Sequence, residues 1–238
     1  MKVLAIDSSG LVASVALVTE GDLIVEYTVN YKKTHSQTLM PMLDEIIKMT
    51  NTDLKDIDGI AISQGPGSFT GLRIGSSTAK GLGLALGLPL IPVPTVDGLA
   101  YNLFEVDKMV CPLMDARRNQ VYTGIYKWIN GEFRVVLPQQ PMDIDEIIIK
   151  LNEFKEEVVF LGDGVKVFED QLKSKVKVPY KFAPAHLSKQ RAGAIGALGL
   201  EYLKKGAVVD GDDFAPTYMR LSQAERELIK KQKIDKGI

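Results

Sequence analysis

The period of apolar and polar positions changes several times along the chain and divides it into strands and helices. From residue 3 to residue 29, short apolar runs alternate with polar turns, which is typical of three strands in an antiparallel meander. Leu39, Leu43, Ile46 and Ile47 then recur at helical spacing, which predicts a helix. Thr34 and Gln37 have the spacing of a capping box, and Pro41 must lie in the first turn of this helix or kink it.

The rest of the first half alternates strands with helices. We predict a strand over 59–63, a helix over 72–86, a strand over 90–93 and a short helix from about 96. The order of the first half is therefore βββαβαβα. A glycine-rich turn separates the strand 59–63 from the helix 72–86.

The second half repeats this order with different residues. Its predicted strands cover 110–114, 120–128, 133–137, 158–161 and 176–182, and its predicted helices cover 143–154, 164–173 and 188–205. We therefore expect an N-terminal lobe at 1–106 and a C-terminal lobe at 107–238, with the charged run 222–238 as a peripheral helix. Two such units resemble the ribonuclease-H-like lobes of the actin, sugar-kinase and Hsp70 superfamily, an α/β architecture.

Charge and composition narrow the function. The 238 residues are 45% apolar and 25% charged, with a formal net charge of −1. Without an overall positive field, an independent RNA-binding module is disfavoured, and work on RNA would need help from a partner. Cys111 is the single cysteine and lies in an apolar run, which predicts a buried thiol. We find neither a signal peptide nor an apolar run of membrane-spanning length, so we expect a cytoplasmic protein without a membrane segment.

The most informative segment runs from residue 63 to residue 75 and contains Gly65-Pro66-Gly67 and Thr70-Gly71. It lies between a strand and a helix, where backbone amides can hold an anion. It is neither a P-loop nor a dinucleotide fingerprint, because the residues after the closing glycine and the glycine spacing do not fit. Anion binding and a tight turn that requires glycine both remain open.

Carboxylates end the first strand of each half, at Asp7 and Asp115. In phosphotransferases of the superfamily, carboxylates at such positions approach the metal and the phosphates. Here the second of the two hairpin turns has no glycine, so we expect at most a degenerate nucleotide cleft. Asp163 could face the same cleft, although turn formation explains it equally well. His35 and His186 lack a second ligand nearby, and we expect no metal site and no cofactor.

Several segments are similar to the TsaB family. They are Val3-Leu4-Ala5-Ile6-Asp7-Ser8-Ser9, the glycine segment with Arg73-Ile74-Gly75, Met114-Asp115-Ala116-Arg117-Arg118, and Tyr218-Met219-Arg220-Leu221. The resemblance implies a paralogue of TsaD, the subunit that transfers threonylcarbamoyl to adenosine in tRNA. TsaD-like proteins carry a metal-binding His-x-x-x-His, and Thr95 and Leu99 stand at the matching positions here. The resemblance therefore implies a non-catalytic subunit that binds and activates TsaD. It also implies that TsaE joins this complex and that the chain reaches tRNA only through it. Without a partner, the chain is expected to form a homodimer.

The family contact is formed by the first two helices of the N-terminal lobe. Helical spacing selects one side of each helix as the expected partner-binding residues. They are Leu39, Leu43, Ile46, Gly75, Ala79, Leu82 and Gly83. Small residues in the second helix would allow close approach of a partner helix, or packing on the chain's own sheet.

The main alternative is an active enzyme with the same fold, either a small-molecule kinase or a metallopeptidase. A kinase needs a phosphate-cradling turn in both lobes, and the second turn lacks glycine. A metallopeptidase needs metal ligands, which Thr95 and Leu99 do not provide.

Overall fold

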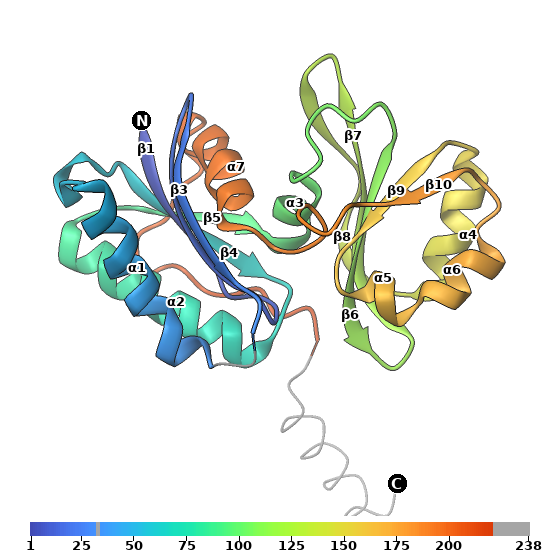
Figure 1. Ribbon diagram of the computed structural model, residues 1–238, viewed down its shortest axis with the longest axis horizontal. Coiled ribbons are helices and arrows are strands. Elements are labelled where there is room, and N and C mark those ends of the chain that lie inside the picture. The colour runs from blue at the N-terminus through green and yellow to red at the C-terminus, as the bar shows by residue number, and fades with distance from the viewer. Residues whose placement is uncertain (32–33, 221–238) are drawn as a thin grey trace, which may run out of the picture.

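A computed structural model describes residues 1–31 and 34–220 and shows two α/β lobes side by side (Figure 1). Within these residues, the first lobe is built on a five-stranded sheet with the order β3-β2-β1-β4-β5. Its strands are β1 (Lys2–Asp7), β2 (Ala13–Thr19), β3 (Leu23–Val29), β4 (Gly59–Gly65) and β5 (Leu90–Pro94). The first three strands pair antiparallel, whereas β4 pairs parallel with β1 and β5.

The second sheet repeats this arrangement, with the order β10-β9-β6-β7-β8 among the described residues. Its strands are β6 (Met109–Arg117), β7 (Gln120–Ile129), β8 (Glu132–Asp143), β9 (Val158–Leu161) and β10 (Tyr180–Phe182). Each meander therefore lies on one side of its first strand and the parallel strands on the other. The predicted two-lobed fold is confirmed.

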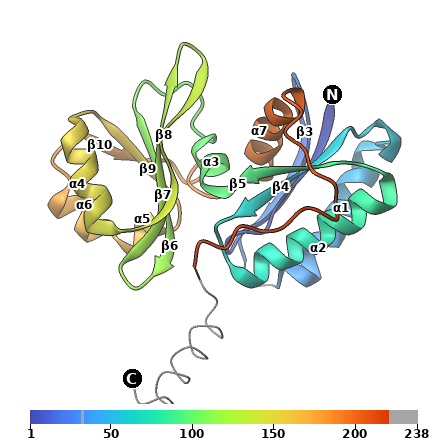
Figure 2. The same cartoon turned by 180° about the vertical axis from the view of Figure 1, so that it is seen from behind.

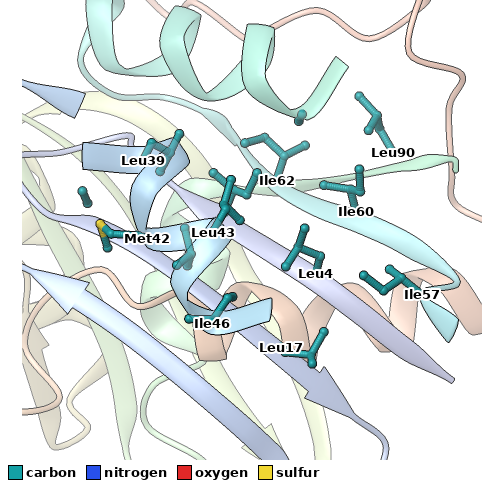
Figure 3. Close-up of a cluster of buried hydrophobic side chains, with 14 of the residues drawn as sticks. Leu4, Leu17, Leu39, Met42, Leu43, Ile46, Ile57, Ile60, Ile62 and Leu90 are labelled. Atoms are coloured by element: carbon teal, nitrogen blue, oxygen red, sulfur yellow. The ribbon is translucent and has the colours of Figure 1, made fainter. Parts of the chain in front are cut away.

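Helices cover both faces of the first sheet. On one face, α1 (His35–Thr50) and α2 (Phe69–Leu86) lie side by side, and the short 3₁₀ helix η1 (Leu54–Asp56) follows α1. Apolar side chains from α1 and the strands interlock between them, as Figure 3 shows for Leu39, Leu43 and Ile46 against Leu4 and Leu17. The periodicity that predicted α1 is thus the periodicity of its buried side.

The second lobe has the same two-sided cover. One face carries α4 (Ile144–Phe154), α5 (Gly164–Val167) and α6 (Glu169–Lys175). The helix predicted over 164–173 is thus two helices, because Phe168 between them has non-helical backbone angles and its ring is buried in the core. Cys111 is buried in this core as predicted, and burial raises its pKa to about 12.

The helices on the remaining faces are exchanged between the two halves of the sequence. The last helix, α7 (Ala192–Lys204), packs on the first sheet, where Ile195 and Leu198 meet Val3 and Ala5. In turn α3 (Thr95–Ala100) from the first half covers the second sheet. Each sheet therefore buries its second apolar face under a helix that the other half of the sequence supplies, and the lobe boundary at residue 106 stays a prediction.

A final segment returns along the first lobe (Figure 2). Val209 pairs with Leu90 of β5, Phe214 is buried in the core, and Thr217 N donates to Gln64 O at 2.8 Å. Residues 218–220 then reach the space between the lobes. The helix predicted over 222–238 lies outside the described residues. No helix of the described chain has the length and apolar character that crossing a membrane requires.

Candidate functional site

The glycine segment packs closely against the β1–β2 turn. A Cβ at Gly67 would lie 2.3 Å from Ser9 O, and one at Gly71 would lie 2.1 Å from Ser8 O. Ser8 Oγ donates to Gly71 O at 2.9 Å. Any larger residue would collide with backbone that cannot move independently. The glycines therefore allow two loops of the first lobe to approach closely.

The N-terminus of α2 is capped by the chain itself. Ser68 N donates to Ser9 O at 2.7 Å, and Ser68 Oγ accepts from Gly71 N at 3.2 Å. Within residues 63–75, Gly65 is the glycine with a positive φ, at 117°. The sequence left two interpretations of these glycines open, an anion site and a tight turn. The close packing of the glycines against the β1–β2 turn supports the second.

Asp7 is buried beneath the contact between the β1–β2 turn and the glycine segment, and it is not among the residues that line the cleft between the lobes. Its Oδ1 accepts from Ser9 N at 2.9 Å, Ser9 Oγ at 2.6 Å and Ser63 Oγ at 3.0 Å, and the residue is 1% exposed. Burial raises the pKa of its carboxyl, and these hydrogen bonds oppose that rise. The carboxylate of Asp7 therefore orders the β1–β2 turn, and its place in a degenerate nucleotide cleft stays a prediction.

Asp115 and Asp163 lie together on the second lobe's side of a cleft of about 810 Å³. Asp115 N donates to Asp163 Oδ1 at 3.1 Å. Gly162 and Gly164 pack against the backbone of Leu113 in β6, where a Cβ would lie 2.1 Å and 2.8 Å from Leu113 O. Asp163 between them lines the cleft. Burial raises the pKa of Asp163, so its carboxyl takes up a proton more readily than an exposed one.

Basic side chains from separate segments surround these two carboxylates. Among the described residues, Arg117, Lys166, Lys189 and Arg220 line the cleft. Arg117 Nε lies 3.8 Å from Asp115 Oδ2. Sequence reasoning missed this cluster, because its members lie at the end of β6, in α5, in the segment before α7 and in the C-terminal segment. No short motif could have joined them.

The C-terminal segment forms one wall of the cleft and connects the two lobes. Tyr218 packs on Phe69 with ring centroids 4.6 Å apart, and the guanidinium of Arg73 lies 4.0 Å from the centre of the Phe69 ring. Arg220 Nη1 donates to Ala116 O in the second lobe. The family-like residues near the C-terminus thus contact both lobes.

Thr95 and Leu99 have structural roles at the positions where TsaD-like proteins carry histidines. Thr95 Oγ1 accepts from Gly65 N at 3.0 Å and is fully buried. Leu99 is 1% exposed and belongs to the apolar cluster between α3 and the second sheet. A hydroxyl and an isobutyl group in these buried positions cannot coordinate a transition metal as two imidazoles do.

The seven residues predicted to bind a partner lie against their own lobe. The exposed fractions of four of them are 1% (Leu39), 4% (Leu43), 1% (Ile46) and 0% (Ala79). Gly75 and Gly83 are also buried, and Leu82 is half-buried against the same core. The apolar periodicity therefore marks the side of each helix that faces the sheet, and a partner-binding role for these residues stays a prediction.

The sequence matches the family described as "TsaD: tRNA N6-adenosine threonylcarbamoyltransferase" over residues 23–228. It is 34% identical to the tRNA threonylcarbamoyladenosine biosynthesis protein TsaB of Bacillus subtilis, over 98% of this chain and 100% of that protein. The chain belongs to the TsaB family. The TsaB protein of Escherichia coli is 33% identical over 71% of this chain and 74% of its own length.

Solved structures agree with this membership. YeaZ from Pseudomonas aeruginosa superposes with a TM-score of 0.78 and 26% identity, over 91% of this TsaB-family chain and 99% of that chain. The ethanolamine utilization protein EutJ from Carboxydothermus hydrogenoformans, at 10% identity and a TM-score of 0.53 over 84% of this chain and 90% of its own, shares the fold alone. This TsaB-family chain therefore has a part in the biosynthesis of threonylcarbamoyladenosine in tRNA.

Proposed function

We propose that this chain is a non-catalytic subunit that binds TsaD and activates it for threonylcarbamoyl transfer to adenosine in tRNA. TsaE joins the complex, tRNA is reached through it, and the cytoplasm is its compartment. The names of the relatives support the pathway, and the TsaD-type family match supports a paralogue of the transferase. The observation that carries the non-catalytic role is the burial of Thr95 and Leu99, which fill the space where imidazoles would stand.

The outward side of α1 and α2 is the contact surface that we propose. Met40 is 50% exposed, Met49 is 70% exposed and Leu84 is 81% exposed, all on helices that cover one face of the first sheet (Figure 1). Gly81 is exposed between the turns of α2, and a Cβ there meets nothing within 4 Å. Exposed apolar side chains of this kind are typical of an interaction surface. The missing side chain at Gly81 lets a partner helix approach the backbone of α2 closely.

Gly81→Arg tests this surface without disturbing the core. The new side chain points into open space, and arginine favours a helix interior over glycine by about 1 kcal/mol, so we expect an equal or higher melting temperature. We expect TsaD binding to weaken at least about tenfold, because a long cation would stand at the contact. Binding is measured by calorimetry with purified TsaD, and self-association by analytical ultracentrifugation.

Gly21→Arg is the matched control. A Cβ at Gly21 also meets nothing within 4 Å, and this residue lies in the β2–β3 turn, away from α1 and α2. It should bind TsaD as the unchanged protein does. Native affinity in the folded Gly81→Arg protein would show that α2 is not the interface.

Reconstitution tests the function itself. Transfer of threonylcarbamoyl to tRNA by TsaD and TsaE should depend on this chain, and the chain alone should show no ATPase or peptidase activity. Full tRNA modification in its absence, or a metal-dependent activity of the isolated chain, would contradict the proposed function and favour an active enzyme of this fold.

A further inference from the structure

An exposed aromatic cluster lies on the second lobe, at the opposite end of β7 from the cleft. Phe104, in the loop between α3 and β6, packs on Trp128 of β7 with ring centroids 4.6 Å apart and is 63% exposed. Tyr101 and Phe133 lie against the same indole ring. Figure 1 shows this loop beside the β7–β8 hairpin. Tyr122 near the start of β7 lines the cleft, and Trp128 lies about 20 Å further along that strand.

Val135 of β8 extends this apolar surface. It pairs with Tyr126, whose ring stacks on Phe133, so Val135 and Phe133 lie on the same face of the sheet. Val135 is 47% exposed. We call Tyr101, Phe104, Trp128, Phe133 and Val135 the aromatic patch. Contiguous apolar side chains in contact with water are typical of an interaction surface.

The backbone beside the aromatic patch is also unpaired. Among the described residues, β8 is an edge strand of the second sheet. The two-residue turn at 130–131 makes Ile129 and Glu132 the closing hydrogen-bonded pair of the hairpin. Hydrogen-bonded and non-hydrogen-bonded pairs alternate in an antiparallel ladder. Phe133 and Val135 therefore direct their N–H and C=O groups away from β7, toward the open edge.

The same two residues thus present apolar side chains to one face and backbone groups to the edge. An extended segment of another chain can add one more strand to such an edge, with its backbone on the ladder and its side chains on the patch. Pro138 and Pro141 further along β8 have no N–H to donate, which limits the added ladder to the beginning of the strand.

Carboxylates border the aromatic patch. Glu105 and Asp107 are exposed in the loop that carries Phe104, and Glu132 is exposed beside the turn. Arg134 forms an ion pair with Glu132, whereas Glu105 and Asp107 form no ion pair with any side chain in the described part of the chain. Three carboxylates and one guanidinium leave an excess of two negative charges around the patch.

This charge favours one kind of occupant over two others. It repels the phosphates of RNA. A second copy of this chain would bring the same carboxylates to the same border, where like charges oppose each other. Lys108, the nearby cation, is already engaged by Glu157 at 2.7 Å. A segment that carries lysine or arginine beside apolar side chains is instead attracted.

We propose that the edge of β8 and the aromatic patch bind an extended segment of a partner protein that combines apolar with basic side chains. The segment pairs with the backbone of Phe133 and Val135, covers the ring of Phe104, and places its cations near Glu105 and Asp107. This surface lies on the second lobe and is separate from the outward side of α1 and α2, where we propose that TsaD binds.

Selection of short random peptides against the full chain tests this surface. The library contains no tryptophan, and the Phe104→Asp variant serves for counter-selection, after its melting transition is shown to be unchanged. Peptides that bind the unchanged chain and not the variant should be rich in valine, isoleucine or phenylalanine together with lysine or arginine. They should be poor in acidic residues.

Binding of a selected peptide is then measured by calorimetry and by fluorescence. Trp128 is the single tryptophan of the chain, so a change in its emission reports on the patch itself. Phe104→Ala should weaken binding at least about tenfold, because an anchor of the contact is removed. Methylation of alternate backbone nitrogens of the peptide should also weaken it, since the ladder loses donors. Added salt should weaken it further.

Phe154→Ala is the matched control. Phe154 is an exposed phenylalanine at the end of α4, which covers the other face of the same sheet, so this variant should bind the peptide as the unchanged protein does. TsaD binding should be unchanged in Phe104→Ala and in Phe154→Ala. Failure of this proposal and failure of the proposed function therefore give different results.

Several results would overturn the proposal. They include a selection in which no peptide distinguishes the chain from Phe104→Asp, and equal affinity for the methylated peptide. Quenching of Trp128 by a single-stranded RNA, lost in Phe104→Ala, would assign the patch to nucleic acid. Self-association in sedimentation that Phe104→Asp abolishes would assign it to a second copy. Loss of TsaD binding in folded Phe104→Ala would make the patch part of the TsaD contact.

Discussion

At the scale of single residues, Asp97 of α3 and Tyr126 of β7 form a buried hydrogen bond across the two halves of the chain. Tyr126 Oη donates to Asp97 Oδ1 at 2.7 Å, and Asp97 is 7% exposed. Burial raises the pKa of Asp97 to about 6, and the bond from Tyr126 opposes part of this rise. Tyr101, Tyr202 and Cys111 are further titrating groups nearby, and burial raises the pKa of each.

The raised pKa makes the ionised carboxyl a cost to stability at neutral pH. The folded state binds a proton more tightly than the unfolded one, so the free energy of unfolding rises as the pH falls from above 6 toward 3.8. We expect Asp97→Asn to stabilise the protein at about pH 7.5 by up to about 3 kcal/mol, and by about half as much at about pH 5. Urea unfolding at both pH values measures the difference.

Tyr126→Phe is the opposing variant. It removes the donor and leaves the Asp97 carboxylate buried without that partner, so it should destabilise the protein more at the higher pH. If Asp97→Asn changed stability equally at both pH values, burial of the ionised carboxyl would not be the cause.

At the scale of elements, α2 contains glycines of two kinds. Gly71 lies where a Cβ would meet Ser8 O at 2.1 Å, whereas Gly81 faces open space. The glycines at 67, 71 and 75 position the helix against the β1–β2 turn, and Gly81 further along leaves its outward side free for close approach. One helix therefore has a packing role at its start and, as we propose, a binding role near its end.

Two alanine substitutions separate these roles. Gly71→Ala should lower the free energy of unfolding by about 1–3 kcal/mol, because the turn or the helix must shift to admit the methyl group. Gly81→Ala should raise it by about 1 kcal/mol through helix propensity alone. Denaturant unfolding of the pair measures both effects. An unchanged free energy of unfolding in Gly71→Ala would mean that the contact between α2 and the β1–β2 turn can admit a methyl group.

At the scale of the whole molecule, the exchange of α3 and α7 makes each lobe depend on the other half of the sequence. Without α7, the face of the first sheet that carries Val3, Ala5 and Val93 would be exposed to water. The close contact between the exchanged helices, where a Cβ at Gly98 would lie 2.3 Å from Ile195 Cδ1, adds to the coupling.

A fragment of residues 1–106 should therefore fail to fold. It should show no cooperative thermal transition by circular dichroism, because the apolar face that α7 covers stays in water. The full chain is the control and should melt in one transition. A cooperative transition in the fragment would show that the first lobe is autonomous and that the exchange is incidental to stability.

The sequence by itself determined the element order, the two-fold repeat and the turn glycines. These follow from periodicity and turn chemistry, which act between residues close along the chain. It also determined that Thr95 and Leu99 cannot supply imidazole ligands, because that depends on residue type alone. From the sequence, Asp115 could be placed at the end of a strand, whereas Asp163 was explained equally well by turn formation. The parallel pairing of β6 with β9 brings the two together.

Only the tertiary structure decided which sheet each helix covers and which side of a helix is free. A stripe such as Leu39, Leu43 and Ile46 fits a sheet and a partner equally well, and burial assigns it to the sheet. The cations of the cleft came from segments as far apart as Arg117 and Arg220, which the fold brings together. Asp7 carries the same chemistry as Asp115, yet the packing of glycines above it removes it from the cleft, because burial depends on contacts that are distant in sequence.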